Sequence, residues 1–217
     1  MMLRLIILRL GLYSIIIIWL SACQHHKVDD TVQQTEWKSD IGYFNARQST
    51  LKDNLLYWRY SAKVGVTTDS VREQANMVWQ HQYLANNIRL YGPLGAGQVQ
   101  LEFDQQNAKL SDNKGIVHQG SDAEALLQDI IGWPVPISAL SYWLFVLPEP
   151  NAVFEYALDD MGNVSQIRQL GWNISFFDYR DYQGITLPRK ITATRNGFAN
   201  SSQVRVKLIT KQWMWSQ

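Results

Sequence analysis

The chain has 217 residues, with 20 basic and 19 acidic side chains and one cysteine. This length suits a single domain with a sizeable core. The near-neutral charge balance excludes the strongly basic footprint of a nucleic-acid-binding domain, and the single cysteine excludes disulfides within the chain and a zinc site made of several thiolates.

The N-terminus has the pattern of a secretory signal peptide that ends at a lipidation site. Arg4 and Arg9 supply positive charge, and an apolar stretch centred on Ile15–Leu20 follows. Residues 21 and 22 are small and directly precede Cys23, which is typical of a signal peptide and of a bacterial lipobox. We therefore expect residues 1–22 to be removed and Cys23 to carry a diacylglycerol and an N-acyl chain.

An uncleaved transmembrane anchor is the alternative. The uncharged stretch from Leu10 to Gln24 is shorter than the roughly 20 residues that a membrane-spanning helix needs, so the sequence favours the lipid anchor. Two or more acyl chains anchor a protein stably, because each buried methylene contributes about 0.8 kcal/mol. In bacterial lipoproteins an aspartate after the cysteine favours retention in the inner membrane, and Gln24 stands there. We therefore expect an outer-membrane lipoprotein that faces the periplasm.

A polar tether and a folded domain are predicted after the cysteine. Residues 23–35 contain no aromatic side chain and predict the tether, whereas residues 36–217 predict the domain. The spacing of Trp37, Ile41 and Phe44 predicts a first helix over about 35–49.

Alternating apolar side chains then predict antiparallel strands. Every second side chain from Leu56 to Val66 is apolar, which predicts a strand with one buried face. Further strands are predicted at 75–81, 88–91 and 98–103. The turn residues Asp112–Gly115 predict a hairpin.

Two short helices are predicted in the middle of the chain. Ser121 and Glu124 have the spacing of a capping box, which predicts that Ser121 caps a helix containing Leu126 to Ile131. The segment Pro134–Pro136 interrupts this helix, and a second helix is predicted over 137–145.

Strand patterns return after Pro150. They cover five segments, at 152–158, 163–169, 172–179, 187–195 and 203–215. Short turns between consecutive strands imply an antiparallel meander, and about ten such strands curl. Because the two apolar helices must bury their faces, a mainly β fold is predicted, with helices inside the concave face of a curled sheet.

The sequence has few catalytic signals. His25 and His26 lie in the predicted tether, and His81 and His118 lie at or near strand ends. The sequence contains no Gly-x-Ser-x-Gly, no His-Glu-x-x-His and no phosphate-binding glycine loop. We therefore expect no enzyme activity, no metal site and no cofactor other than the lipid on Cys23.

The glycine-rich segment Gly92–Gly97 carries one large apolar side chain, Leu94. The residues alone leave two interpretations open. Leu94 folds back into the core, or it is exposed and meets a membrane or a partner.

Several motifs together resemble the LolB family of outer-membrane lipoprotein receptors. The most specific is the block Gly132–Leu144, which Leu147-Pro148 follows. Supporting motifs occur in the same order over nearly all of residues 35–215: Pro93-Leu94-Gly95, Asp112–Gly115, Asp122–Glu124, Gly171-Trp172 and Leu187-Pro188. Gly92 and Val146 depart from the family pattern, which often has asparagine and glycine at these positions.

The resemblance implies an unclosed antiparallel β-barrel of about 10–11 strands, with an apolar cavity covered by short helices. It implies a receptor that accepts acylated lipoproteins from a periplasmic LolA-like carrier and inserts them into the lipid of the outer membrane. It also implies that Pro93, Leu94 and Gly95 form a membrane-inserting loop. The candidate residues for lining the acyl-chain cavity are Trp79, Leu90, Leu101, Leu140, Trp143 and Leu144.

Two other classes of protein remain as alternatives. A lipid-anchored envelope enzyme needs an acid, a base or a nucleophile, and the sequence shows no convergent set. A structural lipoprotein with a filled core needs no cavity. We expect a monomer that binds no nucleic acid.

Overall fold

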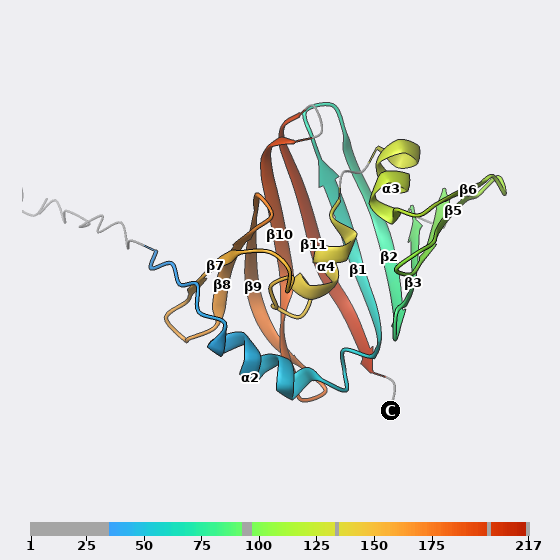
Figure 1. The fold of residues 1–217 in the computed structure, drawn as a ribbon. Coiled ribbons are helices and arrows are strands. Elements are labelled where there is room, and N and C mark those ends of the chain that lie inside the picture. The colour runs from blue at the N-terminus through green and yellow to red at the C-terminus, as the bar shows by residue number, and fades with distance from the viewer. Residues whose placement is uncertain (1–34, 93–96, 133–134, 199–200, 216–217) are drawn as a thin grey trace, which may run out of the picture. The chain divides into compact units, whose positions relative to one another are not determined.

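The computed structural model describes residues 35–92, 97–132, 135–198 and 201–215 (Figure 1). Its helices and strands all belong to one compact unit, Glu36–Gln217. This unit has its own hydrophobic core, which is the property of a domain that folds independently. The predicted signal peptide and Cys23 lie outside the described residues. Within the described ranges, no helix has the length and apolar character needed to cross a membrane.

The first half of the domain is an antiparallel meander of six strands. They are β1 (Tyr57–Thr67), β2 (Arg72–Gln82), β3 (Ala85–Tyr91), β4 (Gln98–Phe103), β5 (Ala108–Asp112) and β6 (Val117–Gly120). Each strand pairs with the next. In β1 every second side chain from Trp58 to Val66 is buried, so the alternation in the sequence correctly predicted a strand with one face in the core. Leu56, which the predicted strand included, precedes β1 and is exposed.

The second half adds five strands and joins them to the first. They are β7 (Phe154–Leu158), β8 (Val164–Gln169), β9 (Trp172–Tyr182), β10 (Ile185–Phe198) and β11 (Ser201–Trp215). Because β11 pairs with β1, the sheet has the order β6-β5-β4-β3-β2-β1-β11-β10-β9-β8-β7. Its edges, β6 and β7, do not pair with each other among the described residues. The predicted open antiparallel sheet of 10–11 strands is therefore confirmed.

The chain crosses one face of the sheet between its two edges. It leaves the sheet at β6 and re-enters it at β7, and the helices α3 (Ala123–Ile131) and α4 (Ile137–Trp143) lie between these strands. Figure 1 shows both helices in front of the sheet. α3 packs on β5 and β6, and buried side chains of α4 belong to the same core as those of the strands. The helices thus cover the inner, apolar face.

The cap of α3 differs from the prediction. Asp122 and not Ser121 is the N-cap, because the helix begins at Ala123 and the short Asp122 carboxylate reaches the amides of Glu124 and Ala125, at 2.8 and 3.2 Å. The Glu124 carboxylate instead accepts a hydrogen bond from the backbone N–H of Ser138 in α4, at 3.1 Å. The predicted capping box is therefore wrong, and its glutamate connects the two helices.

The first helix, α2 (Gly42–Leu51), begins later than predicted. Lys38 forms an isolated β-bridge with Tyr156, in which each backbone N–H donates to the other carbonyl at 2.8 Å. Trp37 and Phe44 therefore belong to different elements, although their spacing has the helical period. Phe44 is buried and attaches α2 to the core.

Candidate acyl-chain site

The six residues predicted to line an acyl-chain cavity lie together in the core. Their exposed fractions range from 0 to 8%, and all of them belong to one apolar cluster: Trp79, Leu90, Leu101, Leu140, Trp143 and Leu144. Ile88 pairs with both Trp79 and Leu101, so these three side chains form one row on the inner face of the sheet. The structure therefore brings the strand candidates and the helix candidates into one place.

These side chains are covered in this conformation. A fatty-acyl chain can reach them only if the elements that cover them move away from the sheet. Access to these side chains therefore depends on how firmly each covering element is attached to the sheet.

The buried Gln169 on β8 attaches α4 firmly. Its exposed fraction is 3%, and its Oε1 accepts hydrogen bonds from Trp143 Nε1 at 3.0 Å and from the backbone N–H of Glu149 at 2.8 Å. Its Nε2 donates to the carbonyls of Glu149 and Ala152, at 2.7 and 3.1 Å. Moving Trp143 away would leave buried polar groups without partners, which costs about 1–3 kcal/mol for each group.

A second attachment holds the segment after α4. Arg47 of α2 donates from Nε to the carbonyl of Phe145 at 2.8 Å and from Nη2 to the carbonyl of Thr186 at 3.1 Å. Burial lowers the pKa of this guanidinium, which nevertheless stays charged at physiological pH. The buried Val146, next in the chain, has φ = +58°, a conformation that glycine adopts without strain.

α3 is attached more weakly than α4. Ala123 and Leu127 are its buried side chains, whereas Gln128, Asp129 and Ile130 are exposed. It packs on β5 and the short edge strand β6, and no hydrogen bond comparable to that between Trp143 and Gln169 holds its described side chains to the sheet. Moving α3 breaks the exposed hydrogen bond between Ser138 and Glu124, whereas moving α4 breaks the buried bond between Trp143 and Gln169, so α3 is the covering element that can move at the lower cost.

Two tryptophans of the inner face, Trp58 and Trp213, and Phe145 in the segment after α4 did not enter the predicted set. The Trp58 ring centroid lies 5.6 Å from that of Phe145 and 5.7 Å from that of Trp213, and it lies 5.2 Å from that of Trp79. This cluster joins the segment after α4 to β1 and β11. The alternation in residues 56–66 places Trp58 on the buried face of its strand, so this residue could have been predicted. The sequence did not reveal which face of the last strand carries Trp213. The Trp213 Nε1–H is buried and has no hydrogen-bond partner among the residues that the structure describes.

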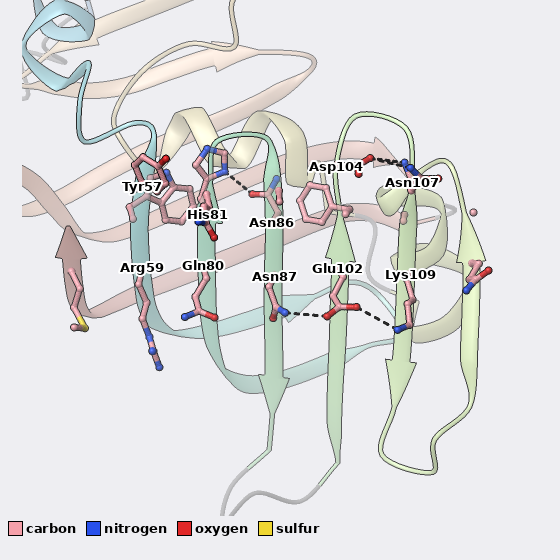
Figure 2. Close-up of a pocket in the computed structure, with 18 of the residues that line it drawn as sticks. Tyr57, Arg59, Gln80, His81, Asn86, Asn87, Glu102, Asp104, Asn107 and Lys109 are labelled. Carbon is pink, nitrogen blue, oxygen red and sulfur yellow. Dashed lines mark hydrogen bonds and ion pairs between the residues drawn. The ribbon is translucent and has the colours of Figure 1, made fainter. Parts of the chain in front are cut away.

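An open groove of about 1020 Å³ lies along β1–β6 and includes Trp58 in its lining. Figure 2 shows a polar row across its strands, formed by the side chains of Arg59, Gln80, Asn87, Glu102 and Lys109. Asn87 donates to Glu102 at 3.4 Å, and Glu102 forms an ion pair with Lys109 at 3.5 Å. The groove is polar along this row, and none of the six predicted cavity residues lines it.

One end of the groove contains a histidine with a defined tautomer. The Asn86 Oδ1 lies 2.9 Å from Trp79 Nε1. The same oxygen lies 2.9 Å from His81 Nδ1 (Figure 2). An indole nitrogen only donates, so the oxygen of Asn86 faces both rings, and His81 Nδ1 must carry a proton. The imidazole stacks on Trp58 at 5.1 Å. In the neutral ring the other nitrogen, Nε2, is therefore a hydrogen-bond acceptor.

The remaining predicted site residues fall outside the described residues. These are Cys23 and the loop residues Pro93, Leu94 and Gly95. The strand ends that flank the loop are described, and Tyr91 of β3 pairs with Gln98 of β4. Among the described residues, no group of three or more histidine, cysteine, aspartate and glutamate side chains is placed to hold a metal ion.

The domain belongs to the class of mainly β proteins in which two short helices cross the apolar face of an open antiparallel sheet. Comparison with known families identifies the family within this class. The family model described as outer membrane lipoprotein LolB matches residues 57–213, from β1 to β11. The chain belongs to the LolB family, which confirms the resemblance found in its motifs.

Individual relatives agree with this assignment. The outer-membrane lipoprotein LolB of Chromohalobacter salexigens is 30% identical over 204 residues, which cover 94% of this chain and 88% of the relative. That of Aeromonas hydrophila is 30% identical over 167 residues, which cover 77% of this chain and 81% of the relative. The crystal structure of a LolA superfamily protein from Nitrosomonas europaea superposes with a TM-score of 0.49 at 7% identity, covering 79% of this chain and 94% of that one.

Proposed function

We propose that this protein accepts acylated lipoproteins from a soluble, LolA-like periplasmic carrier and inserts them into the outer membrane, acting as a monomer anchored by lipid. Membership of the LolB family is the observation that carries this proposal. The relatives that match most of the chain are named outer-membrane lipoproteins. The apolar inner face of the sheet supports it, because such a face can hold acyl chains without chemistry.

Acyl chains need an enclosure at every stage of transfer. Exposing one methylene to water costs about 0.8 kcal/mol, so a lipoprotein with several chains does not cross the periplasm unaided. Transfer without a nucleotide must also run downhill. The receptor therefore holds the chains more tightly than the carrier does, and the bilayer holds them more tightly still.

The weak attachment of α3 and the firm attachment of α4 suggest how the receptor opens. α3 moves away from β5 and β6, whereas Gln169 keeps α4 in place through Trp143. The acyl chains then enter between α3 and the inner face of the sheet, beside Leu101. The proposed site is thus created by movement of one helix.

A reversible covalent link between α3 and β6 tests this proposal. A Cβ atom added at Gly120 would lie 3.7 Å from two side-chain carbon atoms of Leu126, so Gly120→Cys combined with Leu126→Cys brings two thiols close together. In a chain that starts at residue 24 these are the only cysteines. We expect the oxidised form to bind a fluorescent fatty acid at least tenfold more weakly than the reduced form of the same protein.

Each outcome of this experiment has a defined meaning. Gly120→Cys alone is the control, and its affinity should not change with oxidation. Equal affinity of the oxidised and reduced double variants would exclude α3 as the moving element. Turnover of the lipid probe would favour an envelope enzyme, and the absence of saturable binding by the unmodified protein would favour a structural lipoprotein.

The lipid anchor is tested separately. Cys23 is the single cysteine of the chain and follows two small residues, so mass spectrometry of the purified membrane form should detect an N-terminal peptide that begins with acylated Cys23. Cys23→Ser should leave the signal peptide uncleaved by the lipoprotein-specific enzyme, because that enzyme requires the lipid-modified thiol. A membrane form that begins at Met1 or Met2 without lipid would contradict the prediction.

A further inference from the structure

The outer face of the sheet carries a group of basic side chains on its four central strands. Outward positions of β10, β11, β1 and β2 form three neighbouring cross-strand rows: Lys190–Ile209–Lys63–Asn76, Thr192–Lys207–Gly65–Gln74 and Thr194–Arg205–Thr67–Arg72. These rows contain five basic residues and no acidic residue. We call the five residues the basic face; they are Lys63, Arg72, Lys190, Arg205 and Lys207.

The outward direction of these side chains follows from the alternation along each strand. Val64, Val66, Val206 and Leu208 are buried in the core, and the residues between them point the other way. Most of the basic face is exposed, and Lys190 is partly buried. The basic face and the helices α3 and α4 therefore lie on opposite sides of the sheet.

The positive charge of the basic face is not neutralised within the described structure. None of its five residues takes part in an ion pair among the residues described. Lys190 instead lies 4.7 Å from the Phe177 ring centroid, and Arg205 donates to the uncharged Gln203 at 2.9 Å. Because neighbouring strands are only about 4.8 Å apart, these cations repel one another, and an external anionic surface relieves that repulsion.

The geometry of the basic face suits an extended anionic layer. Its charges are spread over four strands of a sheet, and Gly65 at its centre carries no side chain. The row of Lys63 continues through Asn76 to Tyr91 and Gln98, so the basic face lies beside the ends of β3 and β4. Without residues 1–22 the chain has a net charge of −1, so attraction to an anion comes from this local arrangement and not from the total charge.

We infer that the basic face docks the domain onto the anionic phospholipid headgroups of the membrane that carries its lipid anchor, an inference that rests on the proposed outer-membrane location. Docking through the outer face leaves the helix-bearing face accessible from the water. Each cation near an anionic bilayer raises the partition coefficient about fivefold. The domain thus has a preferred orientation on the bilayer, which attachment through acyl chains alone does not provide.

Vesicle binding tests this inference. The chain from residue 24 onward contains the whole compact unit and lacks the lipid, so its binding to vesicles reports on the protein surface. We expect it to sediment with vesicles of phosphatidylethanolamine and phosphatidylglycerol at low salt, and to bind phosphatidylcholine vesicles much more weakly. Lys63→Gln combined with Lys207→Gln should lower the partition coefficient on the anionic vesicles about 25-fold. Raising the salt should weaken binding of the unmodified protein, because salt screens exposed charges.

A matched control separates the local effect from net charge. Lys52→Gln combined with Lys114→Gln removes the same charge from exposed positions outside the basic face, and its partition coefficient should stay within about twofold. Equal loss in both double variants, or equal binding to neutral vesicles, would overturn the inference. So would binding of the basic face to an acidic protein without any binding to vesicles.

The same proteins distinguish this inference from the proposed function. If the Lys63 and Lys207 double variant binds the fluorescent fatty acid normally but loses vesicle binding, docking is supported and the acyl site is unaffected. If the unmodified chain binds anionic vesicles through the basic face but never binds the fatty acid, the docking stands and the receptor function fails.

Discussion

Replacing Gln169 by leucine is expected to lower the free energy of unfolding by about 3–5 kcal/mol. Leucine fills a similar volume but makes none of the four hydrogen bonds that Gln169 makes to Trp143, Glu149 and Ala152. Their polar atoms would then stay buried without partners. Urea denaturation of the chain from residue 24 onward, followed by tryptophan fluorescence, measures the change.

Gln166 on the same strand supplies the control. Its side chain points to the outer face and is partly exposed, so Gln166→Leu should change the unfolding free energy by no more than about 0.5 kcal/mol. A similarly small change for Gln169→Leu would show that α4 is not held by this glutamine. The assignment of α4 as the fixed helix and α3 as the moving helix would then fail.

The largest functional effect is expected from Leu94→Glu, which should slow the delivery of a lipoprotein into liposomes at least tenfold. A leucine side chain contributes about 2–3 kcal/mol when it enters an apolar environment, and about 1.4 kcal/mol changes a rate tenfold. A glutamate removes this contribution and adds a charge that resists burial. Acceptance of lipoprotein from the carrier should be unchanged, and both steps can be measured with the same labelled lipoprotein.

A graded series at this position distinguishes insertion from packing. Leu94→Ala should slow delivery less than Leu94→Glu, and Leu94→Ile should be nearly silent. Normal delivery by the glutamate variant would show that the loop does not insert. Loss of folding in that variant would show that Leu94 is a core residue, which is the other interpretation that the sequence left open.

The strands were predictable because their pattern is local. In β1 the side chains from Trp58 to Val66 alternate, and the structure buries the same set. The pairing of β1 with β11 was not predictable in the same way, because it joins Trp58 to Trp215 near the other end of the domain. Alternation shows that a strand has two different faces, but it does not identify the partner strand.

The starts of two helices were predicted wrongly, because the residue pattern of a helix does not show where the helix begins. The period of Trp37 and Phe44 is helical, yet Lys38 forms a β-bridge with Tyr156, a contact far away in the sequence. At α3 both Ser121 and Asp122 are good capping residues, and the start of the helix decides between them. A tertiary contact thus shortened the first helix, whereas at α3 the local cap decided between two neighbouring residues.

The sequence predicted which apolar residues lie together, but not the polar contacts that hold the helices over them. The sequence and the family resemblance identified apolar residues such as Trp79 and Leu140, which the structure places in one cluster. The polar Gln169 carried no signal in the sequence, because a glutamine in a strand is normally exposed. Its role depends on Trp143, which comes from a helix on the opposite side of the core.

The pairing of β1 with β11 also has a consequence for how the protein folds after secretion. Two meanders, β1–β6 and β7–β11, can each form from neighbouring segments, but the sheet is complete only when the two central strands meet. Contacts between such distant segments form slowly. Until they form, β1 and β11 are both unprotected edges that can pair with other chains. Aggregation during folding is therefore expected to begin in the middle of the finished sheet, at strands that are fully protected in the native protein.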